Sequence, residues 1–222
     1  MTKDIILLTK SWKGGGYCVA GIDTATGKWV RILSNNSSTT KQHAVSEEDM
    51  KYQNGTSAQV WDRVNIECIG STPNYYQPEN YTMDNGYYWG KLGTADIRNV
   101  VSLHPPERHG NLFYNSNKVV DPNEILTINP NERYSLALIK PEEVKICVKR
   151  WDDYRPIITA LFCHMGKKYQ YIKVTDPIFV KQYENIFDGY YDINNVYFVV
   201  SLADLNPKDG LHWKLIASVL QG

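Results

Sequence analysis

Three strand-like runs at the start of the chain, joined by a glycine loop and a tight turn, constrain its fold more than any other feature. The first run ends near Lys13, the second covers residues 17–23, and the third starts at Trp29. Apolar, β-rich runs separated by short turns that contain glycine are typical of consecutive β-hairpins. The opening of the chain therefore predicts a β-sheet protein.

The strand pattern continues along both halves of the sequence. Residues 58–69 alternate apolar and polar side chains, as a half-buried strand does. In the second half the same reasoning predicts strands at residues 134–139, 144–151, 157–164, 168–174, 196–201 and 212–220. Two short helices are also expected, one capped by Ser46 and one over residues 177–187, where Asp176 precedes Pro177.

Residues 70–132 form the least regular segment of the sequence. Prolines recur along it, and tyrosines gather near Tyr75 and Tyr87, with one short helix expected at residues 94–101. Long irregular segments inside compact proteins are uncommon and usually functional or disordered, and the aromatic content argues against disorder. We therefore predict an insertion over about residues 70–132 as part of a first domain of residues 1–132, followed by a second domain of residues 133–222.

The charge balance limits which ligands the chain can bind. The chain has 222 residues, with 24 Lys and Arg against 24 Asp and Glu, so a pervasive basic face for duplex nucleic acid is not expected. An anion can therefore bind only where several cationic side chains are grouped on the surface. The aromatic content of 12% and the apolar content of 42% support a packed core.

The four cysteines are far apart in the sequence and lack the spacing of a zinc site. They are predicted to be reduced and metal-free, and no cofactor is expected. The apolar run at the N-terminus is short for a signal peptide, and no stretch reaches the length of a membrane span. A cytoplasmic protein without membrane contact is the expectation.

Several short motifs resemble the dual OB-containing domain family, a prokaryotic group often associated with defence systems. They are Ser11, Lys13, Gly15, residues 18–22, 29–31, 76–80, 135–142, 174–177, 199–202 and 214–219. The resemblance implies two OB-like barrels in tandem and a role in binding a nucleotide or nucleic acid. Together with the strand pattern, it gives an all-β or β-rich fold with one helix late in the second barrel.

The first candidate ligand site lies in the opening hairpins. Lys10, Lys13 and Arg31 surround the loop Gly14, Gly15 and Gly16, whose backbone N–H groups can approach a phosphate closely. The loop leads into a strand and not a helix, so it is no P-loop. A plain hairpin turn is the simpler interpretation of the three glycines.

Two further groups of candidates lie later in the chain. Tyr76 and Trp89 offer surfaces on which a base can stack, although most such residues pack in cores. Gln77, Glu79 and Asn80 carry groups that can read base or sugar edges, although a polar turn is equally expected there. Lys214 faces away from its neighbours in the last strand, either as an exposed stem or as the second barrel's counterpart to Arg31.

These candidates predict a non-enzymatic module that binds or senses a nucleotide or single-stranded nucleic acid. A nuclease or phosphoesterase that uses His104, Glu107 and His109 is one alternative. A protein–protein adaptor is the other.

Overall fold

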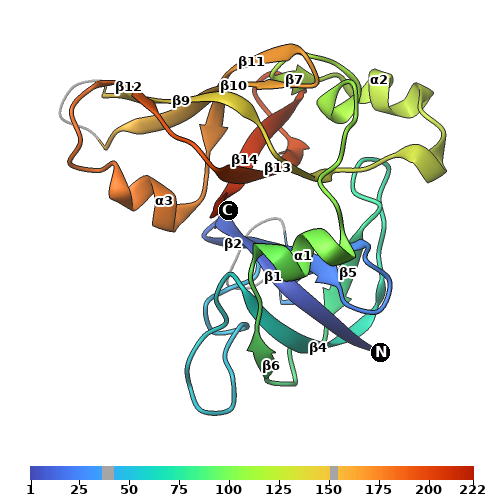
Figure 1. Cartoon of the computed structure of the whole chain (residues 1–222). Helices are drawn as coiled ribbons and strands as arrows, with labels where there is room; N and C mark the ends of the chain where they lie inside the picture. The colour runs from blue at the N-terminus through green and yellow to red at the C-terminus, as the bar shows by residue number, and fades with distance from the viewer. Residues whose placement is uncertain (37–42, 151–154) are drawn as a thin grey trace. The chain divides into compact units, whose positions relative to one another are not determined.

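The computed structural model describes residues 1–36, 43–150 and 155–222, and the chain forms two compact β-rich units (Figure 1). The units are Met1–Pro105 and Pro106–Gly222. The predicted boundary at residue 132 thus lies inside the second unit. The reason is that residues 106–132 pack with later strands: Lys214 Nζ donates a hydrogen bond to the Asn115 carbonyl oxygen (2.6 Å).

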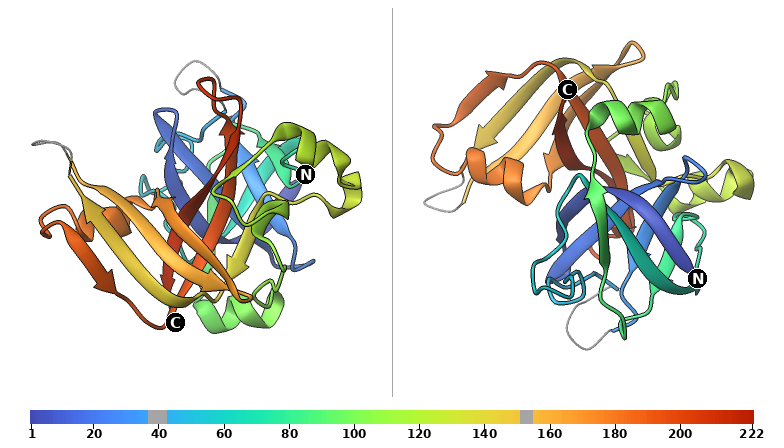
Figure 2. Two further views of the ribbon diagram at one scale, coloured as in Figure 1. Left: turned by 90° about the horizontal axis from the view of Figure 1, so that it is seen from above. Right: turned by 60° about the horizontal axis from the view of Figure 1, so that its bottom comes forward.

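The first unit contains a closed barrel of five strands and an added edge strand. The strands are β1 (Thr2–Lys13), β2 (Gly16–Asp23), β3 (Trp29–Leu33), β4 (Asp62–Ser71), β5 (Asn80–Met83) and β6 (Gly90–Thr94). Their order is β1-β2-β3-β5-β4, and β4 pairs back onto β1, which closes the barrel. Strands β3 and β5 run parallel, while β6 extends the sheet from β4. Figure 2 shows these strands from two further sides.

The alternation of apolar and polar side chains along each strand explains how this barrel forms a core. Val30 and Ile32 of β3, and Val64 and Ile66 of β4, are buried in one apolar cluster. Burial of each such side chain contributes about 1.5–3 kcal/mol. Polar residues alternate with them on β4, where the side chains that face outward are those of Arg63, Asn65 and Glu67. The first four strands confirm the sequence-based prediction.

The second unit repeats the strand order of the first in an open sheet. Its strands are β7 (Val119–Val120), β8 (Leu136–Ile139), β9 (Glu142–Lys149), β10 (Ile157–His164), β11 (Lys167–Val174), β12 (Gly189–Asp192), β13 (Val196–Leu205) and β14 (His212–Gln221). The path β9-β10-β11-β14-β13 corresponds to β1-β2-β3-β5-β4, and β11 pairs with β14 in parallel, as β3 does with β5. Here β12 pairs with β9, and β8 pairs with β13.

Helices are few and short in the described residues. They are α1 (Ile97–Leu103), α2 (Pro122–Thr127) and α3 (Pro177–Gln182), with 3₁₀ turns at Leu112–Tyr114 and Pro130–Glu132. Each α-helix starts after an aspartate whose carboxylate accepts hydrogen bonds from the first turn. Asp176 caps α3 as predicted. None of the helices in the described ranges is long and apolar enough to cross a lipid bilayer.

The structure differs from the sequence-based expectation in several segments. Ser46 and Asp49 exchange hydrogen bonds in a run of turns, where a helix was predicted. Helix α3 ends at Gln182, before Phe187, and the residues from Gly189 form the unpredicted strand β12. The segment predicted as an irregular insertion contains β5, β6, β7, α1 and α2.

Candidate nucleic-acid interface

The glycine loop of the opening hairpin is a two-residue turn. Lys13 pairs with Gly16, and the residues between them have φ angles of 52° at Gly14 and 84° at Gly15. Two consecutive positive φ angles are the mark of the type I′ turn, which glycine adopts without steric cost. The simpler interpretation of the glycines, as a hairpin turn, therefore accounts for this loop. A role in phosphate binding stays a prediction.

The cations near this hairpin have contacts within the barrel. Lys10 Nζ lies 2.9 Å from Glu47 Oε1 and 5.1 Å from the centre of the Tyr17 ring. Arg31 lies on the face of β3 opposite Val30 and Ile32, as alternation predicts. Its side chain is 1% exposed, and Nη1 donates a hydrogen bond to Cys18 Sγ (2.7 Å). Lys10 thus carries a compensated charge, and its assignment to a phosphate site stays a prediction.

Parallel pairing of β3 with β5 joins Arg31 to the tract that ends in Asn80. The two residues are in register, and the Arg31 backbone N–H donates to the Glu79 carbonyl oxygen (2.9 Å). The Asn80 amide in turn donates to Gln77 Oε1 (3.3 Å), and both side chains are buried. Candidate residues that are 46 or more positions apart in the sequence therefore lie close together where β3 pairs with β5. Their assignment to a ligand stays a prediction.

Tyr76 and Trp89 occupy different surroundings. Tyr76 lies in the β4–β5 loop, where its ring meets Tyr75 edge-on at 4.9 Å. Trp89 is 2% exposed and belongs to the core cluster of the first barrel. Its ring therefore packs in the protein, as the alternative interpretation of these aromatic residues held.

Lys214 is a buried amine in the second unit. It is 1% exposed, and its Nζ donates to both the carbonyl and the side-chain oxygen of Asn115, at 2.6 and 2.9 Å. Burial lowers the pKa of Lys214 to about 7. Lys214 lies on β14, which corresponds to β5 of the first unit, whereas Arg31 lies on β3. The role of Lys214 as the second barrel's counterpart to Arg31 stays a prediction.

The histidines proposed for a hydrolase have separate roles. His104 Nδ1 lies 2.8 Å from the Gly27 carbonyl oxygen in the first unit. His109 stacks on Tyr134 in the second, with ring centres 4.3 Å apart. Within residues 1–36, 43–150 and 155–222, no three His, Cys, Asp or Glu side chains are grouped to hold a metal ion. All four cysteines are free thiols.

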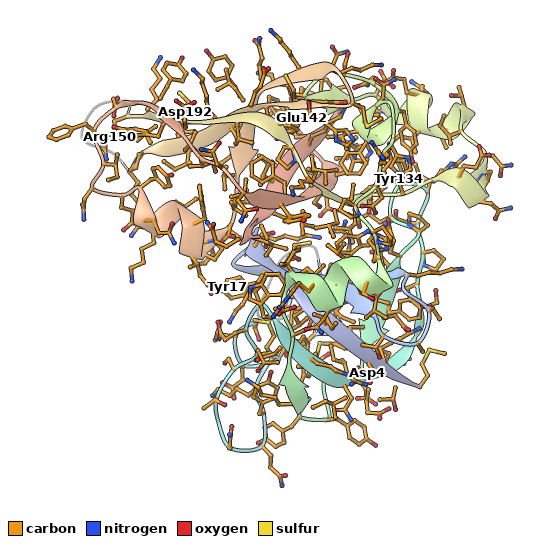
Figure 3. All side chains as sticks on the ribbon, in the orientation of Figure 1. Asp4, Tyr17, Tyr134, Glu142, Arg150 and Asp192 are labelled. Carbon is orange, nitrogen blue, oxygen red and sulfur yellow. The ribbon has the colours of Figure 1, made fainter. Side chains whose placement is uncertain are left out.

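A face of the second unit that the sequence analysis did not single out combines exposed lysines with tyrosines. On β9, Val144, Ile146 and Val148 point into the core, so Lys145 and Lys149 point outward. On β11, Lys168 and Lys173 are exposed, while Tyr169, Ile172 and Val174 are buried. We call this outer surface of β12, β9, β10 and β11 the lysine–tyrosine face. Figure 3 labels Asp192 on β12, and Glu142 and Arg150 near opposite ends of β9.

Two tyrosines lie across this face. Tyr190 of β12 is in register with Cys147, Cys147 with Thr159, and Thr159 with Lys173, so these four residues form one row across four strands. Tyr171 approaches from β11, and its hydroxyl lies 3.0 Å from that of Tyr190. This hydrogen bond raises the pKa of Tyr190 to about 12. Tyr171 is 46% exposed and Tyr190 is 58% exposed, so the two rings form an open aromatic surface.

Acidic side chains on the lysine–tyrosine face lie at its margins. Asp192 Oδ1 is 3.8 Å from Lys145 Nζ at one edge, and Glu143 accepts a hydrogen bond from Cys163 at another. Lys168 and Lys173 form no ion pair with the described residues. The centre of the face therefore carries uncompensated positive charge although the whole chain is neutral.

Register explains why this face escaped the sequence analysis. Each strand contributes one to three outward residues, and a lysine or tyrosine on a half-buried strand normally indicates only a solvated side. The available signal was that lysines recur at exposed positions of both β9 and β11. Their combination depends on which strands become neighbours.

Both units follow the strand order of an OB-fold, with the third and fifth strands parallel. The fold thus defines a protein of two consecutive OB-like units, one of which has a basic, aromatic sheet face. The chain belongs to the dual OB-containing domain family, whose model matches residues 3–219. No curated protein and no solved structure matches the chain.

Proposed function

We propose that this protein is a binding module for single-stranded nucleic acid and that the lysine–tyrosine face is its contact surface. The observation that carries the proposal is the arrangement of Tyr171 and Tyr190 between exposed lysines. Tyr171 lies on β11, the third strand of the OB-like path, and Tyr190 lies on β12, the strand added beside the first. OB-folds commonly bind oligonucleotides through the sheet face at their second and third strands. Here these are β10 and β11.

The chemistry of the face fits a single strand better than a duplex. Bases stack on tyrosine rings, with about 1–3 kcal/mol per base, and the lysines then contact phosphates. A few local lysines in a neutral chain suit a short stretch of backbone, whereas duplex binding usually needs a broad basic footprint. Stacking without edge-reading groups predicts weak sequence preference.

Binding of fluorescent oligonucleotides tests this proposal. Oligo-dT and oligo-U of about 12 nucleotides are titrated with the whole chain at several salt concentrations, and binding is followed by anisotropy. The double variant Lys168→Gln/Lys173→Gln should bind more weakly, with the slope of log K against log salt reduced by about 1.4. Tyr190→Ala should weaken binding by about tenfold.

The matched control removes the same charge elsewhere in the second unit. Lys181 in α3 and Lys208 before β14 are exposed and lie off the face. The variant Lys181→Gln/Lys208→Gln should keep the salt slope of the wild type. The proposal would be refuted if the wild type bound no oligonucleotide, or if both double variants lost the same amount of oligonucleotide affinity.

A protein-binding role is the second candidate, because one aromatic side chain is unusually exposed. Phe187, between α3 and β12, is 88% exposed, and Ile178 and Ile186 nearby are 58% and 37% exposed. Exposed apolar side chains of this size mark interaction sites when they gather. If Phe187→Ser abolished binding of a partner protein and the lysine variants left all measured binding unchanged, the adaptor would replace the nucleic-acid module.

A further inference from the structure

A second candidate site lies on the first barrel, in a hollow of about 630 Å³. Asn65 and Glu67 line it from the outer side of β4, and the residues from Tyr87 to Lys91 line it from the segment that enters β6. Residues 52–54 complete the wall. A volume of this size lies within the range of sites for small organic ligands, about 300–1,000 Å³.

Aromatic side chains provide the hollow with exposed surfaces and a rigid floor. Tyr87 and Tyr88 are 60% and 66% exposed. Beneath them, Tyr52 and Trp89 are held in the core, and the Tyr52 hydroxyl donates to Asp62 (2.7 Å). Trp89 Nε1 is buried and finds no hydrogen-bond acceptor among the described residues. A buried donor of this kind normally has a partner, so a water molecule or ligand is expected close to it.

Two side-chain amides that line the hollow are available for hydrogen bonds to a ligand. The side chains of Asn65 and Gln53 form no hydrogen bond within the described part of the chain. Gly90 makes room for Asn65, because a Cβ at position 90 would lie 1.9 Å from Asn65 Oδ1. An amide offers a donor and an acceptor side by side, which is the pattern that pairs with the edge of a nucleobase.

The charges of the hollow are compensated. Lys91 Nζ lies 2.5 Å from Asp62 Oδ1, so its charge is used within the barrel. Glu67 accepts a hydrogen bond from Thr2 (2.6 Å) and lies 3.9 Å from the amine of Met1. No cation of the lining is left over for a phosphate, in contrast to the lysine–tyrosine face of the second unit.

The geometry points to a binding site for an uncharged nucleobase or nucleoside in this hollow. Tyr87 or Tyr88 stacks on the ring, and Asn65 reads its edge. The carboxylate of Glu67 accepts an N–H group of the base or a ribose hydroxyl. The inference stands apart from the proposed function, since it concerns another unit, another kind of ligand and none of the same residues.

Titration of the whole chain with adenosine, guanosine, cytidine and uridine, followed by saturation-transfer NMR and calorimetry, tests the site. At least one nucleoside should bind, with its aromatic protons receiving the strongest saturation. Tyr88→Ala and Asn65→Ala should each weaken its binding by about tenfold, whereas Tyr88→Phe should keep it. Trp12→Ala is the matched control, because it removes an exposed aromatic side chain of the first unit that does not line the hollow, and it should leave nucleoside affinity unchanged.

Two kinds of outcome overturn the inference, namely the absence of the expected nucleoside binding and a preference for a charged ligand. The site is refuted if the wild type binds none of the four nucleosides, or if Tyr88→Ala and Asn65→Ala bind as the wild type does while their melting curves are unchanged. If the 5′-monophosphates bind more than about tenfold tighter than the nucleosides, an uncharged ligand is excluded. Loss of oligonucleotide binding in the lysine variants, with nucleoside binding intact, separates this site from the proposed function.

Discussion

The buried amine of Lys214 makes the stability of the second unit depend on pH. Burial lowers its pKa from the ordinary value of 10.5 to about 7, and nearby Glu124 opposes this shift. The folded protein therefore releases this proton before the unfolded chain does. Between those two pKa values the unfolded chain binds more protons, so stability must rise with pH over this window.

The size of the effect follows from the shift. Each pKa unit corresponds to about 1.36 kcal/mol, and linkage gives a gain of roughly 2.5 kcal/mol in unfolding free energy from about pH 6 to about pH 9. Lys214→Met removes the titrating group and keeps the length of the side chain. It also leaves the two Asn115 oxygens without their donor, which costs about 1–3 kcal/mol.

Urea denaturation of both proteins at the two pH values measures this difference. Because the chain has two units, the transition of the second is followed separately by hydrogen exchange of β13 and β14. The variant should lose most stability relative to the wild type near pH 9 and least near pH 6. Lys181→Met, on an exposed helix position, should show no such pH dependence. Parallel pH curves for wild type and Lys214→Met would refute the assignment of a depressed pKa to this amine.

The remaining predictions concern single contacts. Asp176→Ala removes the cap of α3 and leaves the Val219 N–H without its acceptor, so chemical denaturation should show a loss of about 2–4 kcal/mol. Gly90→Ala should displace the Asn65 side chain, cost about 1 kcal/mol and abolish nucleoside binding in calorimetry, while the fold survives. Arg31→Ala should weaken binding of mononucleotides by tenfold or more if the opening hairpin binds phosphate; equal titration curves would leave that hairpin as scaffold.

The sequence by itself determined the secondary structure of most strands and the family. Alternation along β4, β9 and β10 is local, because each side chain's face depends only on its position in its own strand. The cap at Asp176 and the turn at Gly14 were equally readable, since their geometry involves a few consecutive residues. Short motifs at both ends and in the middle of the chain were enough to predict the dual OB-containing family.

Only the tertiary structure decided the division between the units and the composition of the candidate sites. Residues 106–132 looked like part of an insertion until the pairing of β7 with β14 and the contact from Lys214 to Asn115 placed them in the second unit. Lys214 carries the same outward-facing signature in the sequence as Lys145, yet one is buried and the other exposed. The physical reason is that burial and grouping depend on strand neighbours distant in the sequence, which alternation within one strand does not specify.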